Sequence, residues 1–219
     1  MNIAWHGQSY FEIAAKGANN DVVKIAIDPY GDGIGLKPPK VEADILLITH
    51  QHSDHNNKSA IKGDPFIIET PGEYELKGIF IQGIRAFHDN SKGEERGEVV
   101  VYTLEAEGIK LCHLSDLGQK ELSDEQVEKI GEVDVLITPV ASQHSLDAKG
   151  AAGIISQIEP RMVIPMHYKI PKLTSKDSID GVDKFLKLMG AEDTQPEKKL
   201  KLSLKDLPQE EIKIVVLEP

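Results

Sequence analysis

The chain has 219 residues, of which 40% are hydrophobic and 28% are charged, and its formal net charge at pH 7 is −11. This composition is ordinary for a globular protein that can bury a full core, and we expect one compact domain over residues 1–219. The negative charge repels phosphate backbones and the basic residues are spread along the chain, so nucleic acid is not an expected partner.

The lack of a recognisable signal peptide and the presence of a single cysteine favour a location in the cytoplasm. The first residues lack the cationic start and apolar run of a signal peptide, and no run of about 18 apolar residues occurs. We therefore expect neither export nor a membrane-spanning segment. Cys112 is the single cysteine and lies in a strand-like stretch, where a buried, inert thiol is expected.

The first half of the chain has the pattern of a β meander with few helices. Its apolar runs are separated by Gly, Pro and Asn, as is typical of strands and turns. These runs cover residues 2–14, 22–27, 45–49, 66–69, 79–87 and 99–104. The glycine-rich stretch 30–35 does not open a helix, so we interpret it as a flexible loop and not as a phosphate-binding loop.

The second half alternates between strands and helices. The predicted strands cover residues 110–114, 135–138 and 162–165, the predicted helices cover 123–130, 148–158 and 178–188, and two short strands, 200–204 and 212–217, close the chain. Ser123 with Gln126 is a plausible helix start, and Gly190 a plausible helix stop. The Lys-rich segment 197–201 is interpreted as the solvent face of an edge strand.

This order of elements predicts an α/β (α+β) fold. Two sheets that face each other, with helices on the outside, would accommodate both halves of the chain. The strands 45–49 and 135–138 are almost entirely apolar, so we expect both of their faces to be covered.

Three histidines and an aspartate follow the apolar run 45–49 on one short turn. They occupy positions i, i+2, i+4 and i+5 of the segment His50-Gln51-His52-Ser53-Asp54-His55. Because a strand fixes its last residue and then releases the backbone into a loop, these side chains can converge just beyond the sheet edge. Imidazole nitrogen with carboxylate oxygen suits zinc and its neighbours, whereas magnesium and calcium prefer oxygen alone. The segment therefore predicts a metal site.

Three more residues of the same types stand at the ends of other predicted strands. They are His88, Asp116 and His167. One such residue alone could be a capping or core residue, but all three are placed as His50 is, where a strand gives way to a loop. We therefore treat them as further candidate metal ligands.

The patterns T-H-Q-H-S-D-H, F-H-D, H-L-S-D-L-G and I-P-M-H-Y resemble those of the metallo-β-lactamase superfamily. The similarity covers nearly the whole chain. Within this superfamily, the chain looks like the small bacterial and archaeal metal-dependent hydrolases that are related to the L-ascorbate-6-phosphate lactonases. The resemblance implies a four-layer αβ/βα sandwich and a dinuclear metal site. In that site His50, His52 and His88 would hold one ion, Asp54, His55 and His167 would hold the other, and Asp116 would bridge them.

The resemblance also implies a mechanism. Two divalent ions about 3.5–4 Å apart would share a water and lower its pKa towards neutrality. Zn²⁺ is the expected metal, with Mn²⁺, Ni²⁺ and Fe²⁺ as alternatives that ligand type does not exclude. Asp54 and Asp116 are the expected catalytic residues, and Asp54 would orient the water while it binds a metal.

Several other residues are candidates for orienting ligands or contacting substrate. Asp28 and Glu73 could accept hydrogen bonds from the ligating imidazoles, and the sequence does not rank them. Gln8 stands where many relatives have His, and Gln cannot act as a general acid. His113 has either an orienting or a structural role. His144 lies in a segment where relatives commonly have a glycine-rich loop, so it is a candidate substrate contact and substrate choice is expected to differ.

The expected function is metal-dependent hydrolysis of a small ester, lactone, amide or phosphodiester. The alternatives are a non-hydrolytic metal-binding or redox protein on the same scaffold, and an enzyme with promiscuous β-lactamase activity. The expected partner is a small-molecule substrate, with no membrane and no nucleic acid, and an assembly of identical chains remains open.

Overall fold

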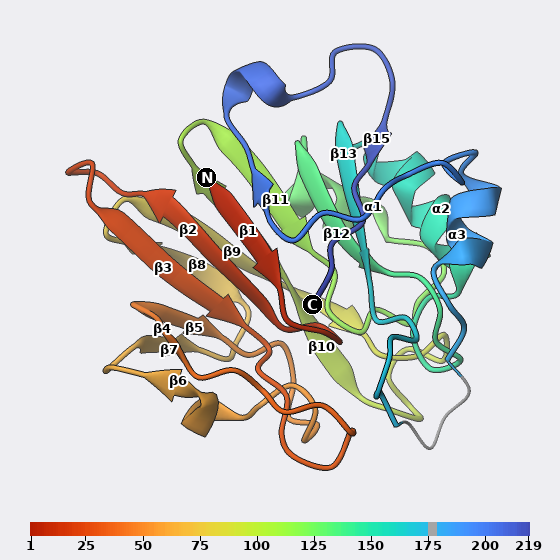
Figure 1. The fold of residues 1–219 in the computed structure, drawn as a ribbon, viewed down its shortest axis with the longest axis horizontal. Coiled ribbons are helices and arrows are strands. Elements are labelled where there is room, and N and C mark those ends of the chain that lie inside the picture. The colour runs from red at the N-terminus through yellow and green to blue at the C-terminus, as the bar shows by residue number, and fades with distance from the viewer. Residues whose placement is uncertain (175–178) are drawn as a thin grey trace.

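Two β-sheets pack face to face in the computed structural model, which describes residues 1–174 and 179–219 (Figure 1). In the described residues the first sheet has six strands in the order β14-β1-β2-β3-β5-β7. These strands are β1 (Asn2–Trp5), β2 (Phe11–Lys16), β3 (Val22–Ile27), β5 (Ile45–Leu47), β7 (Phe66–Ile68) and the edge strand β14 (Leu200–Lys201). A small separate ladder joins β4 (Val41–Glu42) to β6 (Ile61–Lys62).

The second sheet has seven strands within the described part of the chain, in the order β15-β13-β12-β11-β10-β9-β8. They are β8 (Gly72–Leu76), β9 (Ile79–Phe87), β10 (Glu98–Ala106), β11 (Ile109–His113), β12 (Val135–Pro139), β13 (Met162–Met166) and β15 (Lys213–Ile214). β9 and β11 both run antiparallel to β10, and β11, β12, β13 and β15 are parallel. The ends of β9, β11 and β13 therefore meet at one edge of the sheet.

The α-helices all come from the second half of the chain and lie beside the second sheet, at the right of Figure 1. They are α1 (Asp124–Ile130), α2 (Ala148–Ile158) and α3 (Asp183–Leu188), and two short 3₁₀ helices are η1 (Lys58–Ala60) and η2 (Leu204–Asp206). The predicted mixed fold with few helices in the first half is confirmed. No helix in residues 1–174 and 179–219 combines the length and apolarity needed to cross a membrane.

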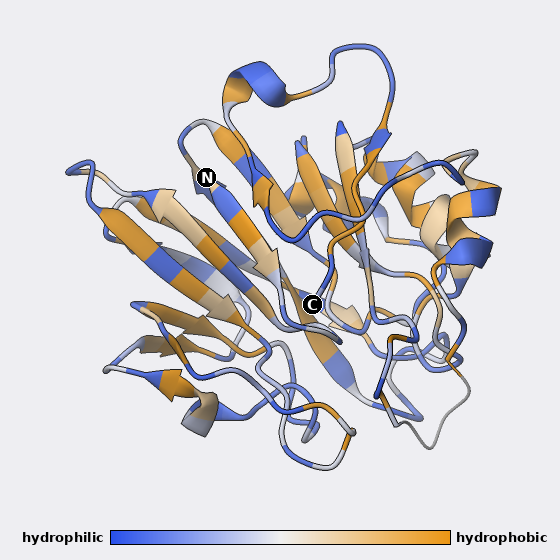
Figure 2. Ribbon diagram, in the orientation of Figure 1, coloured by the Kyte–Doolittle hydropathy of each residue, from blue (hydrophilic) through white to orange (hydrophobic). Residues whose placement is uncertain are grey.

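One hydrophobic core joins the two sheets. Trp5 and Phe11 of the first sheet are buried, and their rings contact Tyr168 (centroids 4.9 Å apart) and His113 (5.6 Å) from the second half of the chain. All residues of β5 and β12 are buried, which confirms that both faces of these strands are covered. Figure 2 shows the hydrophobic residues concentrated in the strands and the hydrophilic ones in the connecting loops. Removal of this apolar surface from water is the main source of stability.

Most predicted elements are confirmed, and β3, β9 and α2 have the predicted bounds. The run 2–14 is two strands and not one, because Gly7 and Gln8 have φ values of 97° and 50° and turn the chain. β8 was not predicted, because most of its residues are polar or exposed. The closing strands are shorter than predicted, and β14 is an edge strand as expected of the Lys-rich segment. The stretch 30–35 contains no helix, as predicted.

Helix α3 begins at Asp183, later than the predicted residue 178, which lies outside the described residues. The reason is a tertiary pairing. Ile179 forms an antiparallel bridge with Ser142, and the amide of Asp180 donates to the carbonyl of Ala141 at 3.0 Å. This pairing holds the chain extended just before the helix. Gly190 follows α3 with a φ of 66°, so the predicted helix stop is confirmed.

The predicted start of α1 is a capping box. The Ser123 hydroxyl accepts from the amide of Gln126 (3.2 Å), and the Gln126 side-chain oxygen accepts from the amide of Ser123 (2.9 Å). The two residues thereby satisfy two donors that the first turn of a helix leaves without partners.

We predict that Ser123→Ala lowers the free energy of unfolding by about 1 kcal/mol, because one of these donors loses its acceptor. Urea denaturation measures the change. Ser156→Ala is the matched control, since Ser156 is exposed in the interior of α2 and caps nothing. An equal loss in both variants would contradict the capping role.

Candidate metal centre

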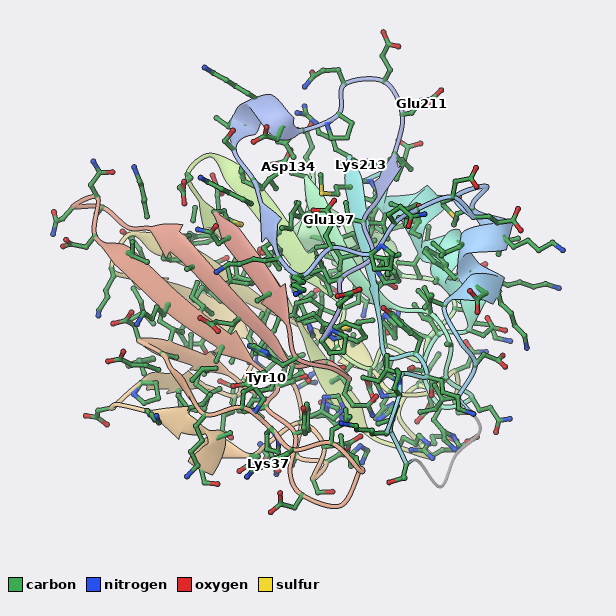
Figure 3. All side chains as sticks on the ribbon, in the orientation of Figure 1. Tyr10, Lys37, Asp134, Glu197, Glu211 and Lys213 are labelled. Atoms are coloured by element: carbon green, nitrogen blue, oxygen red, sulfur yellow. The ribbon has the colours of Figure 1, made fainter. Side chains whose placement is uncertain are left out.

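The predicted ligands from four strand ends lie together at one end of the two sheets. His50 follows β5 of the first sheet, while His88, Asp116 and His167 follow β9, β11 and β13 of the second. Figure 3 helps to locate this end: Asp134 and Lys213, at the starts of β12 and β15, lie at the top, and Tyr10 lies below, where β1 turns into β2. The site therefore exists only where the ends of both sheets meet.

The candidate ligands form two groups. In each group one potential ligand atom per residue lies within 4.8 Å of the others. The groups are His50, His52 and His88, and Asp54, His55 and His167. These are the two groups that the resemblance to the superfamily implies. Asp28, His50 and His55 also have ligand atoms within 4.8 Å of one another, but the Asp28 carboxylate accepts hydrogen bonds from Thr49 and His55.

Asp116 lies between the two groups. Its Oδ2 atom is 3.7 Å from Nε2 of His88 in the first group. The same oxygen is 3.2 Å from Nε2 of His55 and 3.4 Å from Nε2 of His167 in the second group. The other carboxylate oxygen, Oδ1, accepts a hydrogen bond of 3.3 Å from the hydroxyl of Ser9. One carboxylate oxygen thus contacts imidazoles of both groups.

Asp28 fixes the orientation of two of the imidazoles. It is fully buried at the end of β3 and accepts hydrogen bonds from the Thr49 amide (2.8 Å), the Thr49 hydroxyl (2.6 Å) and Nδ1 of His55 (2.8 Å). Because the Thr49 hydroxyl donates to Asp28, its oxygen can accept from Nδ1 of His50 at 3.0 Å. Nδ1 of each imidazole therefore points its hydrogen at these acceptors, and Nε2 faces the centre.

The same orientation follows for His88, whose Nδ1 lies 3.2 Å from the main-chain oxygen of His144. Glu73, the other carboxylate that the sequence offered, is exposed on β8. Asp28, and not Glu73, therefore orients the imidazoles. The sequence could not rank the two because only the pairing of β3 with β5 brings Asp28 to Thr49.

Several buried polar atoms at the centre have no hydrogen-bond partner among the described residues. They are Nε2 of His55 and both ring nitrogens of His167. Nε2 of His50 and Nδ1 of His52 lie only 3.0 Å apart. Buried polar atoms without partners are destabilising, and a divalent cation at the centre would satisfy Nε2 of His55 and of His167. The nitrogen and oxygen donors suit zinc-type ions, so the residues present fit a metal.

Electrostatics favour the ligating forms of His50, His88 and Asp116, whereas an ion would have to displace a proton from His55. Burial lowers the pKa of His50 to about 2 and also lowers the pKa of His88, so both imidazoles are neutral at pH 7. Burial would raise the pKa of Asp116, but His167 and His55 hold it well below its usual range. Burial likewise opposes protonation of His55, but Asp116 and Asp28 raise its pKa well above the usual value. These carboxylates favour a positive charge at the centre.

The three further candidates have different surroundings. Gln8 contacts the site through its main chain: its carbonyl accepts from the amide of His167 (3.3 Å) and from the indole of Trp5 (2.8 Å). His113 is buried, accepts on Nδ1 from the amide of Ser115 (3.1 Å), and burial lowers its pKa to about 4. It is a neutral residue that shapes the turn leading to Asp116.

His144 is half-buried and lines a cavity of about 250 Å³ over the metal centre. The other lining residues are His52, Ser53, Asp54, His88, Arg96 and Asp116. Sequence reasoning missed Arg96 and Ser9. Neither residue type is typical of a metal ligand, and neither follows a predicted strand, so no local signal marked them.

The chain is similar to known proteins in both sequence and structure. A family model described as the beta-lactamase superfamily domain matches residues 2–167. A solved structure from Thermotoga maritima, assigned to a Zn-dependent hydrolase of the metallo-beta-lactamase superfamily, is 31% identical, covers 99% of each chain and has a TM-score of 0.78. Proteins named UPF0173 metal-dependent hydrolase are similar over most of their length. The protein of Thermococcus onnurineus (strain NA1) is 26% identical over 87% of this chain and 92% of its own length. The protein of Anoxybacillus flavithermus (strain DSM 21510 / WK1) is 27% identical over 86% of this chain and 97% of its own length.

We predict that Asp28→Asn weakens Zn²⁺ binding by about 10- to 100-fold, because the amide cannot accept all three hydrogen bonds that orient His50 and His55. Asn tolerates the φ of 48° at this position. Titration with chelator-buffered Zn²⁺ measures the affinity. Asp134→Asn is the control, because Asp134 accepts from the amide of Lys110 at the opposite end of the sheet. Unchanged affinity in Asp28→Asn would contradict the orienting role.

A second prediction concerns Gly118, which packs against the backbone of the His88 loop. A Cβ atom there would lie 2.6 Å from the amide nitrogen of Asp89 and closer still to the carbonyl of His88. Gly118→Ala should displace His88 and weaken Zn²⁺ binding by about 10-fold or more. Gly153→Ala is the control, because the nearest atom to its Cβ is 3.9 Å away. Wild-type affinity in Gly118→Ala would show that His88 does not need this contact.

Proposed function

Because the chain belongs to the beta-lactamase superfamily domain family, and relatives across its length are named metal-dependent hydrolases, we propose that it hydrolyses a small substrate at a dinuclear metal centre. The observation that carries the proposal is the position of Asp116. A carboxylate oxygen that contacts imidazoles of two separate ligand groups is suited to bridge two ions.

We assign the ligands by group. The first ion would be held by His50, His52 and His88, the second would be held by Asp54, His55 and His167, and Asp116 would lie between them. Bound divalent ions supply Lewis acidity and a water whose pKa is lowered towards 7. The proposed metal is Zn²⁺, since nitrogen and carboxylate donors suit it, with Mn²⁺, Ni²⁺ and Fe²⁺ as alternatives.

The chain's own residues prepare this chemistry. Asp28 and the His144 carbonyl accept hydrogen bonds from Nδ1 of His55 and His88, so Nε2 of these two imidazoles faces the proposed ions. Asp54 is half-buried at the cavity wall, with Oδ2 3.7 Å from Nε2 of His55. Its carboxylate can accept a hydrogen bond from the attacking water and so orient it.

The proposed substrate is a small ester, lactone, amide or phosphodiester. Among these reactions we favour lactone hydrolysis of the L-ascorbate-6-phosphate lactonase type. The cavity of about 250 Å³ supports a small molecule and not a polymer. We also propose that the protein acts in the cytoplasm, since its single cysteine, Cys112, is buried and its thiol pKa is raised to about 12 by burial.

We predict that Asp116→Ala and His52→Ala lose metal and hydrolysis together while the fold is retained. Changes to groups behind metal ligands lower activity about 10- to 100-fold, so loss of a ligand should lower it at least as much. Elemental analysis, circular dichroism and a panel of a lactone, a phosphodiester and a β-lactam provide the measurements. His6→Ala is the control, because His6 contacts Glu12 outside the site.

Two outcomes would change the assignment. Full turnover by a metal-depleted variant would refute metal-dependent hydrolysis. An iron-loaded, coloured wild-type protein that hydrolyses nothing in the panel would favour the redox alternative, and turnover of the β-lactam alone would favour a β-lactamase.

A further inference from the structure

A second chamber adjoins the proposed metal centre. The cavity over the centre is lined in part by Arg96 and His144, and the same two residues line a neighbouring cavity of about 500 Å³. A substrate whose reacting bond lies at the metals could therefore extend past Arg96 into this chamber. The chamber is polar, and Lys120, Ser142 and Ser145 are among its lining residues.

Arg96 is held in place by the loop that also carries His88. The Asp89 carboxylate accepts four main-chain hydrogen bonds in this loop, of 2.7 to 3.1 Å. Their donors are the amides of Ser91, Gly93, Glu95 and Arg96. The amide of His88 donates to the carbonyl of Gly97 (3.0 Å), which closes the loop. A substitution of the Arg96 side chain leaves these main-chain bonds in place.

The guanidinium of Arg96 is not paired within the described chain. The sequence has three arginines, and two of them form ion pairs: Arg85 with Glu98 (3.3 Å) and Arg161 with Asp134 (3.6 Å). No carboxylate of residues 1–174 or 179–219 lies within 4.0 Å of the Arg96 guanidinium. In a protein with a net charge of −11, an unpaired arginine beside the candidate active site points to a ligand.

The acidic side chains around the chamber already have donors of the protein's own. Asp89 accepts the four amides described above. Glu95 accepts from the Ser91 hydroxyl (3.0 Å), Asp147 accepts from the amide of Gly150 at the start of α2 (2.8 Å), and Asp180 pairs with Lys184 (2.7 Å). Donors that line the chamber and can meet a ligand include the Arg96 and Lys120 cations and the buried Ser145 hydroxyl, which lacks a described partner.

We propose that Arg96, supported by Lys120 and the Ser145 hydroxyl, binds an anionic group of the substrate that lies away from the bond to be cleaved. The planar guanidinium matches the two oxygens of a carboxylate or a phosphate. The inference rests on the proposed hydrolase function and narrows its substrate to small molecules that carry one of these two groups.

A set of matched lactones tests the inference. γ-Hydroxymethyl-γ-butyrolactone is the neutral member, its phosphate ester is the second, and the lactone with a carboxylate in place of the hydroxymethyl group is the third. The metal-loaded wild-type protein should hydrolyse one or both anionic lactones with a kcat/KM about 10- to 100-fold above that of the neutral lactone. The preferred anion identifies the group as phosphate or carboxylate.

Arg96→Gln should remove this preference, because KM for the anionic lactone rises towards that for the neutral lactone. Arg96→Lys keeps the positive charge but lacks the paired donors of the planar guanidinium, so it should keep part of the preference. Arg161→Gln is the matched control, because Arg161 pairs with Asp134 at the far end of the molecule (Figure 3) and should change nothing. Equal ratios in wild type and Arg96→Gln would overturn the proposal.

A binding measurement separates this inference from the proposed function. Inorganic phosphate is titrated calorimetrically into metal-loaded wild type, Arg96→Gln and Arg161→Gln, and any binding to the metals cancels in the comparison. About 10-fold weaker binding in Arg96→Gln alone supports the anion site even if no lactone is hydrolysed, an outcome that would count only against lactone hydrolysis. Equal binding in all three proteins refutes the anion site.

Discussion

The buried carboxylate of Asp28 is the group on which the geometry of the candidate site depends. β3 and β5 are parallel neighbours with Ile27 opposite Leu47, so the residues after these two strands lie side by side. There Asp28 accepts hydrogen bonds from Thr49 and His55, and Thr49 in turn holds His50. A buried charge that lost these donors would be strongly destabilising, so the fold and the orientation of two imidazoles are maintained by the same hydrogen bonds.

The remaining parts of the site come from the other sheet, and contacts between the sheets hold them in register. The Ser9 hydroxyl donates to Asp116, the Gln8 carbonyl accepts from the amide of His167, and Phe11 packs on His113. All three contacts originate in the turn between β1 and β2 or at the start of β2. Packing of the two sheets on a shared core therefore sets the distances between ligands that arise from separate strands.

In the proposed function, the metal centre carries out the reaction and the neighbouring chamber recognises the substrate. The imidazoles and Asp116 would hold a reactive centre that many substrates could use, because it would contact only the bond that is cleaved. Recognition then depends on the loops around it, and both the His88 loop and the segment that carries His144 line the chamber. Such loops can change without altering the ligands, which explains how one scaffold can serve several substrates.

Local patterns in the sequence were sufficient for β3, β9, α2 and the capping box of α1, because hydrophobic periodicity and side-chain capping act between residues close in the chain. The histidine-rich turn after β5 was visible for the same reason. The tertiary structure alone decided that Asp28 orients the imidazoles, that Ile179 is held extended before α3, and that Arg96 lies beside the site with no ion-pair partner among residues 1–174 and 179–219. Each of these depends on neighbours that are distant in sequence, and only the pairing of strands and the packing of the two sheets bring those neighbours together.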